Sequence, residues 1–397
     1  MTVEFDPFSR DFFDDPYATY ARLRDEAPCY HSERYDFYAL SRYEDVVAAH
    51  RDHDTFISSR GLTYEQLSDP DADVAGSLIM MDPPDHTRYR KLVSRAFTPR
   101  AMASWEDLVR GIVSGYLEPL VGEPSFDLVG EFAGPFPVEV ISAILGVPED
   151  DRQQIRHWTD TMLRREEGEA VSGAAAQEAG IAQTMYFLEL VAEKRRYPGD
   201  DMLSALVAAE VETGDGGTAS LHDIEIAAFG TLLGAAGSET VTKLVGNAAV
   251  LFHRNPDQWR LVKDGSELHA DAVEEILRYW PPSQYQGRCS AVESEWHGVT
   301  VPSGKPMFLL TGAATHDERA YEDPDRFDVR REQALAIGLG HGVHACLGAA
   351  LARLESRVAI GEMAARLPDF AVDEAGCERV QMSNVAGYSK VPVHTGH

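Results

Sequence analysis

Nine segments of this chain carry apolar residues at spacings of three and four, and this periodicity constrains the fold most. Residues three and four apart share one face of an α-helix, so the spacing predicts amphipathic helices. The nine segments are residues 17–27, 41–50, 86–97, 102–118, 137–146, 176–195, 221–252, 266–279 and 347–366. Strand-like stretches are shorter, at residues 37–40, 295–301, 306–310 and 390–394. The sequence therefore predicts a mainly α fold with small β-sheets. No repeat or low-complexity linker divides it, so residues 1–397 are expected to form a single domain.

The charge balance excludes several classes of partner. The chain has 36 basic and 65 acidic residues, a formal net charge of −29. Such a surface repels nucleic acid and anionic membranes, so any acidic partner needs a local basic patch. No uncharged apolar run approaches the roughly 20 residues of a membrane span, and the N-terminus does not have the pattern of a secretory signal. Four cysteines do not make a disulfide framework, and a cytoplasmic location is expected.

One of these cysteines, Cys346, follows a run in which glycines alternate with other residues, Gly338-Leu339-Gly340-His341-Gly342. A helical pattern begins directly after Cys346, so the thiol is expected at a helix N-terminus, where a thiolate is stabilised. A thiolate in a tight glycine loop is a good ligand for iron. A buried apolar cysteine is an equally favoured interpretation on local grounds. A zinc site of His341, His344 and Cys346 is also open, although no second ligand pair follows, and the glycine spacing fits no phosphate loop.

The segment resembles the haem-binding loop of cytochrome P450 monooxygenases, whose pattern is FxxGxxxCxG, and in particular the soluble bacterial class I members. Leu339 stands where that family usually has phenylalanine. The resemblance implies a single triangular domain that encloses haem b between a long central helix and the cysteine-loop helix. It also implies that Cys346 is the ligand of the haem iron.

Two further motifs stand in the family's order. Glu275 and Arg278 are three residues apart on one helix, a spacing that by itself indicates only a solvent-exposed ion pair. The resemblance implies the structural ExxR motif, with Arg326 as its third partner. The segment Leu233–Thr242 is rich in glycine and alanine, and a threonine such as Thr240 can bond back to the carbonyl of Ala236.

The alternative for the Leu233–Thr242 segment is plain helix packing with Glu239 on a wet face. The resemblance implies instead that Thr240 hydrogen-bonds dioxygen and that Glu239 relays protons.

A fourth motif places His86 and Arg90 four residues apart, on one face of a helix. Alone, this spacing indicates a solvated basic face. By resemblance to the family's HxxxR pattern, the pair holds the haem propionates, and Arg288 and His344 match further propionate partners. Arginine and histidine donors suit these carboxylates.

The resemblance as a whole implies an enzyme that inserts one oxygen atom from O2 into a hydrophobic small molecule. Its electrons come from NAD(P)H through a ferredoxin reductase and a ferredoxin. The substrate class is left open among terpenoids, steroids, fatty acids and aromatics. The alternatives are a peroxide-using haem-thiolate peroxygenase and a non-catalytic haem- or metal-binding helical protein.

Two sets of residues are expected at the surfaces where the substrate and the electron donor bind. By resemblance, the substrate pocket includes Leu232, Ala235, Ala236 and Val385. A local basic patch for an acidic ferredoxin includes Arg88, Lys91 and Arg95, with Arg353 and Arg357 near it.

Overall fold

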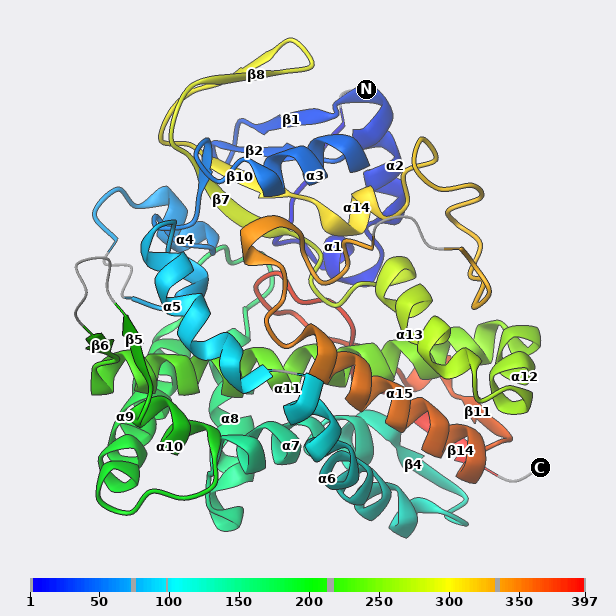
Figure 1. Ribbon diagram of the computed structural model, residues 1–397. Helices are drawn as coiled ribbons and strands as arrows, with labels where there is room; N and C mark the ends of the chain where they lie inside the picture. Colours follow the sequence, from blue (N-terminus) through cyan, green and yellow to red (C-terminus); the bar gives the residue numbers. More distant parts are fainter. Residues whose placement is uncertain (1–2, 73–75, 98, 213–217, 333–335, 396–397) are drawn as a thin grey trace.

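The computed structural model describes residues 3–72, 76–97, 99–212, 218–332 and 336–395. The fold is mainly helical with small sheets (Figure 1). The helices are α1 (Arg10–Asp14), α2 (Tyr17–Glu26), α3 (Tyr43–Arg51), α4 (Tyr64–Ser68), α5 (Asp85–Val93), α6 (Pro99–Leu117), α7 (Pro135–Leu145), α8 (Arg152–Leu163), α9 (Ala174–Arg196), α10 (Met202–Val207), α11 (Asp223–Arg254), α12 (Pro256–Asp264), α13 (Leu268–Tyr279), α14 (Thr311–Ala314) and α15 (Ala349–Arg366). All nine predicted helical segments are helices here, which confirms the predicted class.

Helix α11 is the central element, and it runs across the middle of the molecule in Figure 1. Its 32 residues pack against α7, α8, α9, α13 and α15. Two glycines on α11 make the crossing with α9 close, because a Cβ at Gly230 would lie 2.6 Å from the Phe187 ring and one at Gly234 would lie 2.7 Å from the Gln183 amide. The small residues of this segment therefore bring α9 against the helix backbone.

The largest sheet has five strands in the order β1-β2-β10-β7-β3, and it lies above α11 in Figure 1, beside α2 and α3. Strands β2 and β10 are parallel, whereas the other pairs in this sheet are antiparallel. The strands are β1 (Cys29–Ser32), β2 (Phe37–Leu40), β3 (Phe56–Ile57), β4 (Ser125–Asp127), β5 (Glu210–Glu212), β6 (Thr218–Ser220), β7 (Gln286–Ser290), β8 (Ser294–Trp296), β9 (Val299–Val301), β10 (Pro306–Leu309), β11 (Phe370–Val372), β12 (Glu378–Arg379), β13 (Tyr388–Lys390) and β14 (Pro392–Thr395). Strand β7 of this sheet carries Arg288, one of the predicted site residues.

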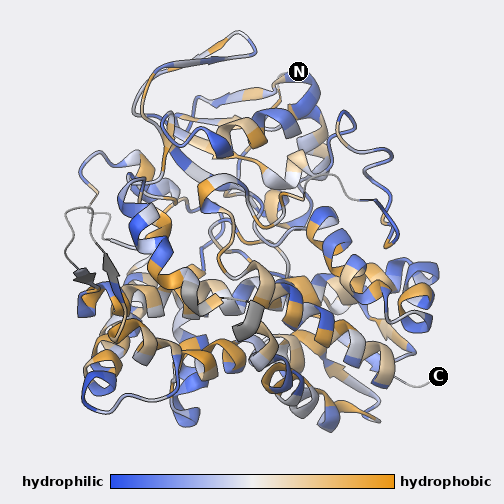
Figure 2. Ribbon diagram, in the orientation of Figure 1, coloured by the Kyte–Doolittle hydropathy of each residue, from blue (hydrophilic) through white to orange (hydrophobic). Residues whose placement is uncertain are grey.

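Hydropathy follows this architecture, since most helices carry both apolar and polar residues along their length (Figure 2). The main core gathers side chains from α5, α6, α7, α9, α11, α13 and α15, and a second cluster joins α1 and α2 to the large sheet. Within the described residues, no helix is both long and apolar enough to cross a membrane.

Candidate functional site

The cysteine loop spans residues 336–348. It contains a short 3₁₀ turn, η6 (Gly342–His344), and leads into α15. Its backbone is closed by hydrogen bonds from the Gly340 N–H to the Ile337 oxygen and from the Cys346 N–H to the Leu339 oxygen, both 2.8 Å long. Gly342 has a φ of 69°, and a Cβ there would lie 2.1 Å from the backbone oxygen of His50. Only glycine fits this position, because both the backbone angle and the contact exclude a side chain.

Cys346 lies three residues before the first residue of α15, so the predicted helix start is displaced by two residues. The cysteine is exposed, although protein surrounds the sulfur closely enough for desolvation to raise its pKa. The N–H of Gly348 and the charges of Arg90 and Arg353 oppose this rise. The helix end and these cations thus stabilise the thiolate only in part, and a bound metal cation would supply the remaining stabilisation.

Buried and half-buried basic groups gather beside this loop. The structure brings together the four residues expected from the sequence, namely His86 and Arg90 of α5, Arg288 of β7 and His344 of η6. The rings of His86 and His344 are 4.3 Å apart between centroids. Arg90 donates a hydrogen bond of 2.5 Å from Nη2 to the backbone oxygen of Ala345, so this cluster is attached to the residue before Cys346.

These basic groups lie where a positive charge is costly. Burial is the main cause that lowers the pKa of Arg288, to about 10. Burial, with Arg288 close by, also lowers the pKa of His344 to about 3, and the pKa values of His86 and Arg90 are lowered as well. Neither buried ring nitrogen of His86 has a hydrogen-bond partner among the residues that the structure describes. A set of crowded, desolvated donors fits an anionic ligand, and two propionate carboxylates have the required chemistry.

The sequence did not single out two residues of this cluster, His50 and Ser58. His50, near the end of α3, is 5% exposed and has a pKa lowered to about 3, first by burial and then by Arg288. The hydroxyl of Ser58 lies 3.2 Å from Nε2 of His344. Both residues come from distant parts of the chain, and no local motif marks them.

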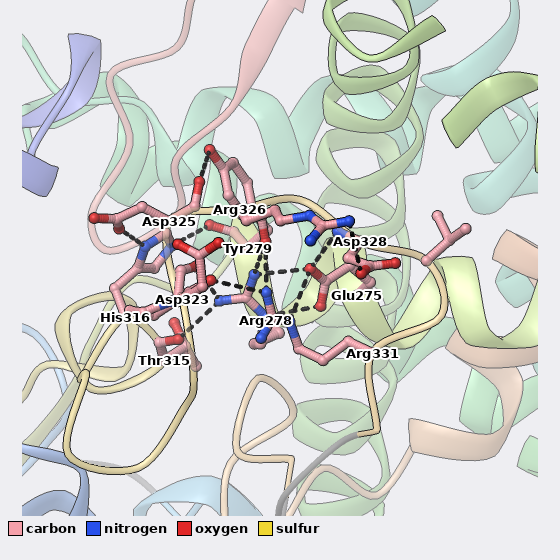
Figure 3. Close-up of polar contacts among 12 residues, drawn as sticks. Glu275, Arg278, Tyr279, Thr315, His316, Asp323, Asp325, Arg326, Asp328 and Arg331 are labelled. Atoms are coloured by element: carbon pink, nitrogen blue, oxygen red, sulfur yellow. Dashed lines mark hydrogen bonds and ion pairs between the residues drawn. The ribbon is translucent and has the colours of Figure 1, made fainter. Parts of the chain in front are cut away.

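A buried ion-pair network lies on the other side of the loop, at the end of α13 (Figure 3). Arg278 donates two hydrogen bonds of 2.8 Å to the carboxylate of Glu275. Its remaining N–H groups reach the backbone oxygens of Thr315, Pro324 and Arg326. Both members of the pair are almost fully buried, so the alternative of a solvent-exposed pair is wrong.

The prediction that Arg326 is the third partner through its side chain is also wrong. The Arg326 side chain is 62% exposed and pairs with Asp328 at 3.4 Å, and only its backbone oxygen joins the network. Arg331 takes the expected place, with Nε 3.3 Å from Oε1 of Glu275 (Figure 3). The chain between these arginines is irregular, so no periodicity indicates which of them points inward.

The middle of α11 carries the predicted catalytic pair. Oγ1 of Thr240 donates to the Ala236 oxygen at 2.9 Å, as the sequence predicted. Glu239 is 4% exposed and forms an ion pair with Lys243, one turn further along α11, which is itself 3% exposed. The alternative that Glu239 lies on a wet face is therefore wrong. Burial is the main cause that raises the pKa of Glu239, and Lys243 opposes it.

The expected substrate-pocket residues differ in exposure. On α11, Ala236 is exposed and Leu232 is half-buried, whereas Ala235 is buried. Val385 is also buried and packs with Val380 and Met382. Their assignment to the substrate pocket stays a prediction.

The residues of the expected basic patch differ in exposure and in pairing. Lys91 is exposed and Arg88 is half-buried on α5. The side chain of Arg95 lies outside the part of the chain whose side chains the structure describes. Arg353 pairs with Glu274, and Arg357 pairs with Glu106 at 3.2 Å. These two arginines therefore contribute less positive potential than their sequence positions imply.

A cysteine on a glycine loop, set among buried arginine and histidine donors and packed beside a long central helix, defines a haem-thiolate protein. The described residues contain no group of three or more histidine, cysteine and acidic side chains arranged to hold a metal ion, so the zinc alternative has no support there. Comparisons with known proteins agree with this class.

The family model for cytochrome P450 matches residues 267–379. The putative cytochrome P450 123 of Mycobacterium tuberculosis is 40% identical over 391 residues, which cover 98% of this chain and 96% of the relative. The vitamin D(3) 25-hydroxylase of Pseudonocardia autotrophica is 37% identical over 401 residues, covering 100% and 97%. The structure of cytochrome P450 CYP109Q5 from Chondromyces apiculatus has a TM-score of 0.89 at 30% identity, covering 100% of this chain and 99% of that chain. The chain belongs to the cytochrome P450 family: it is a haem-thiolate monooxygenase, and its cofactor is haem b.

Proposed function

We propose that this enzyme hydroxylates a hydrophobic small molecule with one oxygen atom of O2, using electrons from NAD(P)H delivered by a ferredoxin reductase and a ferredoxin. The observation that carries the proposal is the hydrogen bond from Arg90 to Ala345, which joins the buried donor cluster to the cysteine loop. The sulfur ligand and the carboxylate-binding donors thereby form one site.

The cofactor is proposed to bind through groups that the chain already places together. The Cys346 thiolate would hold the iron. The four donors His86, Arg90, Arg288 and His344 would hydrogen-bond the propionates, which supply the negative charge that the crowded donors need. Haem bound to a thiolate supplies the activation of dioxygen. The other contributions that the protein makes to the reaction are positioning and proton transfer.

Proton transfer is proposed to depend on Thr240 and Glu239. The Thr240 hydroxyl bonds to its own helix at Ala236, so it can rotate from that carbonyl to donate a hydrogen bond on the open side of the helix. Glu239, whose pKa is raised above its ordinary value first by burial, can hold a proton at higher pH than an exposed glutamate can. Retention of both groups favours oxygen-dependent turnover over direct use of peroxide.

The substrate is proposed to be apolar because the exposed and half-exposed residues of α11 near Thr240 are small or aliphatic, namely Ala236 and Leu232. A relative over the whole chain is named for the 25-hydroxylation of vitamin D(3). Terpenoids, steroids, fatty acids and aromatics are therefore the compounds to screen, with shifts of the Soret band as the measure of binding.

A carbon monoxide difference spectrum of the reduced protein tests the core of this proposal. We expect a thiolate-type Soret band in the wild type and its loss in C346A. A band that survives C346A would overturn the assignment of the ligand. Turnover with labelled O2, compared with turnover driven by hydrogen peroxide alone, separates the proposed monooxygenase from a peroxygenase.

A further inference from the structure

A cavity of about 440 Å³ lies between the N-terminal helices α1 and α2, the end of α13 and the C-terminal half of α11. Asn247, which follows Thr240 by about two turns of α11, is one of its lining residues. Of the described residues that line the cavity, none belongs to the donor cluster or to the cysteine loop. Its volume lies in the range of small-molecule sites.

Aromatic rings form one wall of this cavity. The ring centroids of Tyr17 and His316 are 4.5 Å apart, and those of His316 and Tyr279 are 5.1 Å apart. Trp280 continues the row, 6.0 Å from Tyr279. His316 is fixed in place by Asp325 and by the backbone oxygen of Tyr279 (Figure 3). The wall therefore offers a fixed set of ring contacts to the planar ring of a ligand.

A buried hydrogen-bond acceptor is left over in the lining. Asn247 is 2% exposed, and its Nδ2 donates to the backbone oxygen of Trp280 at 3.2 Å. Its Oδ1 is buried and has no hydrogen-bond partner among the residues that the structure describes. A buried acceptor without a partner is costly, so a ligand with a hydroxyl donor would gain binding energy at this point.

A positive charge is also left over. The guanidinium of Arg379 lies over the Tyr388 ring, 4.0 Å from its centroid, and 5.2 Å from the centroid of Trp280. Arg379 is half-buried, and no carboxylate of the described residues forms an ion pair with it. Ring faces stabilise a guanidinium but do not neutralise it.

The other charged groups of the lining do not leave a charge of this kind. Most have a partner of opposite charge, in the pairs Arg24–Glu318, Arg254–Glu374, Asp14–Arg10 and Asp325–His316. Asp15 is exposed, where water and salt screen its charge, and it accepts a hydrogen bond from the Tyr17 N–H. The charge that calls for a counterion is therefore that of Arg379, which favours an anionic ligand.

The cavity lies behind a turn that is expected to face the substrate. Gln284 and Ala386 line it, and Val385, the neighbour of Ala386, is a predicted substrate-pocket residue. The N–H of Gln284 donates to the oxygen of Asn384 at 2.9 Å, and the N–H of Ala386 donates to the oxygen of Pro282 at 2.8 Å. These bonds join the 282–284 and 384–386 segments, so a ligand that packs against one of them acts on both.

We propose that this cavity is an effector site for an aromatic carboxylic acid that carries a hydroxyl group. Its carboxylate pairs with Arg379, its ring lies against the wall that includes Tyr17 and Trp280, and its hydroxyl donates to Oδ1 of Asn247. The joined segments transmit its binding to the substrate pocket. Binding to the cavity is independent of the proposed function, whereas the effect on the substrate pocket rests on it.

Two probes with the same phenol ring and opposite charges test the recognition. 4-Hydroxyphenylacetate is expected to bind the ferric, haem-loaded protein saturably in calorimetry, and tyramine is expected to bind about tenfold more weakly or worse. R379Q is expected to weaken the binding of 4-hydroxyphenylacetate by about tenfold or more, because a charged partner is lost. R22Q removes an exposed arginine of α2 that pairs with Glu26, and it is the matched control without an effect.

A second pair of variants locates the probe without removing a charge. Ala18 is exposed on α2 and lines the cavity, so A18F fills the cavity from its surface side and leaves the core in place. We expect A18F to abolish binding of 4-hydroxyphenylacetate. A175F makes the same change at an exposed position of α9 and is expected to bind as the wild type does.

Coupling to the substrate pocket is measured with 4-phenylimidazole, whose nitrogen binds haem iron and shifts the Soret band. Saturating 4-hydroxyphenylacetate is expected to change the Kd of 4-phenylimidazole by about fivefold or more, up to a plateau, and 4-phenylimidazole is expected to change the Kd of 4-hydroxyphenylacetate by the same factor. An unchanged Kd would overturn the effector role.

The binding site itself would be overturned by the absence of saturable binding, by wild-type affinity in R379Q and A18F, or by tighter binding of tyramine. It would also be overturned if 4-hydroxyphenylacetate competed with 4-phenylimidazole without a plateau, because the probe would then occupy the substrate pocket. Calorimetric binding that R379Q and A18F abolish, in a protein without the thiolate Soret band, would reject the proposed function and retain the site.

Discussion

Nη2 of Arg90 donates a hydrogen bond to the backbone oxygen of Ala345, the residue that precedes Cys346. Helix α5 therefore supports the cysteine loop directly. Because the same side chain is proposed to hold the propionates, its loss is expected to affect the cofactor more than the fold.

Replacing Arg90 with leucine is expected to speed the loss of haem. A hydrogen bond to or from a charged group contributes about 1.5–3 kcal/mol, which corresponds to about a ten- to hundredfold change in retention. Transfer of haem to excess apomyoglobin measures the rate. R10L, which removes an exposed arginine paired with Asp14, is the control, and equal rates in both variants would contradict the role of Arg90.

The buried pair of Glu275 and Arg278 is expected to make a large contribution to the free energy of unfolding. E275Q leaves Arg278 and Arg331 without their carboxylate, and breaking a buried pair in this way costs about 3–5 kcal/mol. Urea unfolding of the haem-free protein measures the loss, with D14N in the exposed Arg10–Asp14 pair as the control.

The two candidate third partners of Glu275 are distinguished by a second pair of variants. R331L removes a side chain that reaches Glu275, whereas R326L removes one that is 62% exposed. We expect a clear decrease in the urea midpoint for R331L and little change for R326L. A larger decrease for R326L than for R331L would instead support Arg326 as the third partner, as the sequence predicted.

His50 is expected to make the haem-free protein less stable in acid. Burial, with Arg288 and His341 nearby, lowers its pKa from 6.5 to about 3 in the folded protein. Between these values the unfolded chain binds a proton that the folded chain does not. The contribution of neutral, buried His50 to the free energy of unfolding is therefore complete above pH 6.5. It decreases as the pH falls toward 3, by up to about 1.4 kcal/mol per pH unit.

Urea unfolding across this pH range is expected to give a shallower slope for H50Q than for the wild type. H31Q changes an exposed histidine beside Asp36 and is expected to leave the slope as it is. Parallel slopes in the wild type and H50Q would show that His50 is not buried in its neutral form.

Charge reversal on α5 is expected to slow electron delivery. Lys91 is exposed and Arg88 is half-buried there, and opposite charges steer an acidic donor only at low ionic strength. In stopped-flow reduction by an acidic ferredoxin under carbon monoxide, R88E and K91E are expected to be several-fold slower than the wild type, and the difference is expected to shrink with added salt. K263E on α12 is the control, and a salt-independent defect would point away from electrostatic docking.

Most of the helical architecture could be predicted from the sequence because apolar periodicity is strong there. The segment predicted at 221–252 is helix Asp223–Arg254, and the one predicted at 102–118 is helix Pro99–Leu117. Helix α8 was not predicted because only Ile155 and Thr159 are buried on it. The stretch 295–301 is a hairpin rather than one strand, since His297 and Gly298 have positive φ values of 51° and 78°.

The site could be predicted where a motif is local and not where it depends on distant packing. His50 and Ser58 join His344 only because α3 and the segment after it pack on the cysteine loop, nearly 300 residues away along the chain. Lys243 is different, because its spacing of four from Glu239 was visible in the sequence. Its burial was not visible, since that depends on the space left by Gly387.

The contact between Gly342 and the backbone oxygen of His50 has a consequence for engineering this enzyme. The end of α3 touches the turn that carries the sulfur ligand, without an intervening side chain, and α3 itself packs on β10 of the large sheet. A small displacement of α3 is therefore transmitted to the surroundings of the sulfur, and the hydrogen bonding and solvation of a thiolate set the reduction potential of its iron. Substitutions under α3 therefore offer a way to tune that potential without changing a residue of the cysteine loop itself.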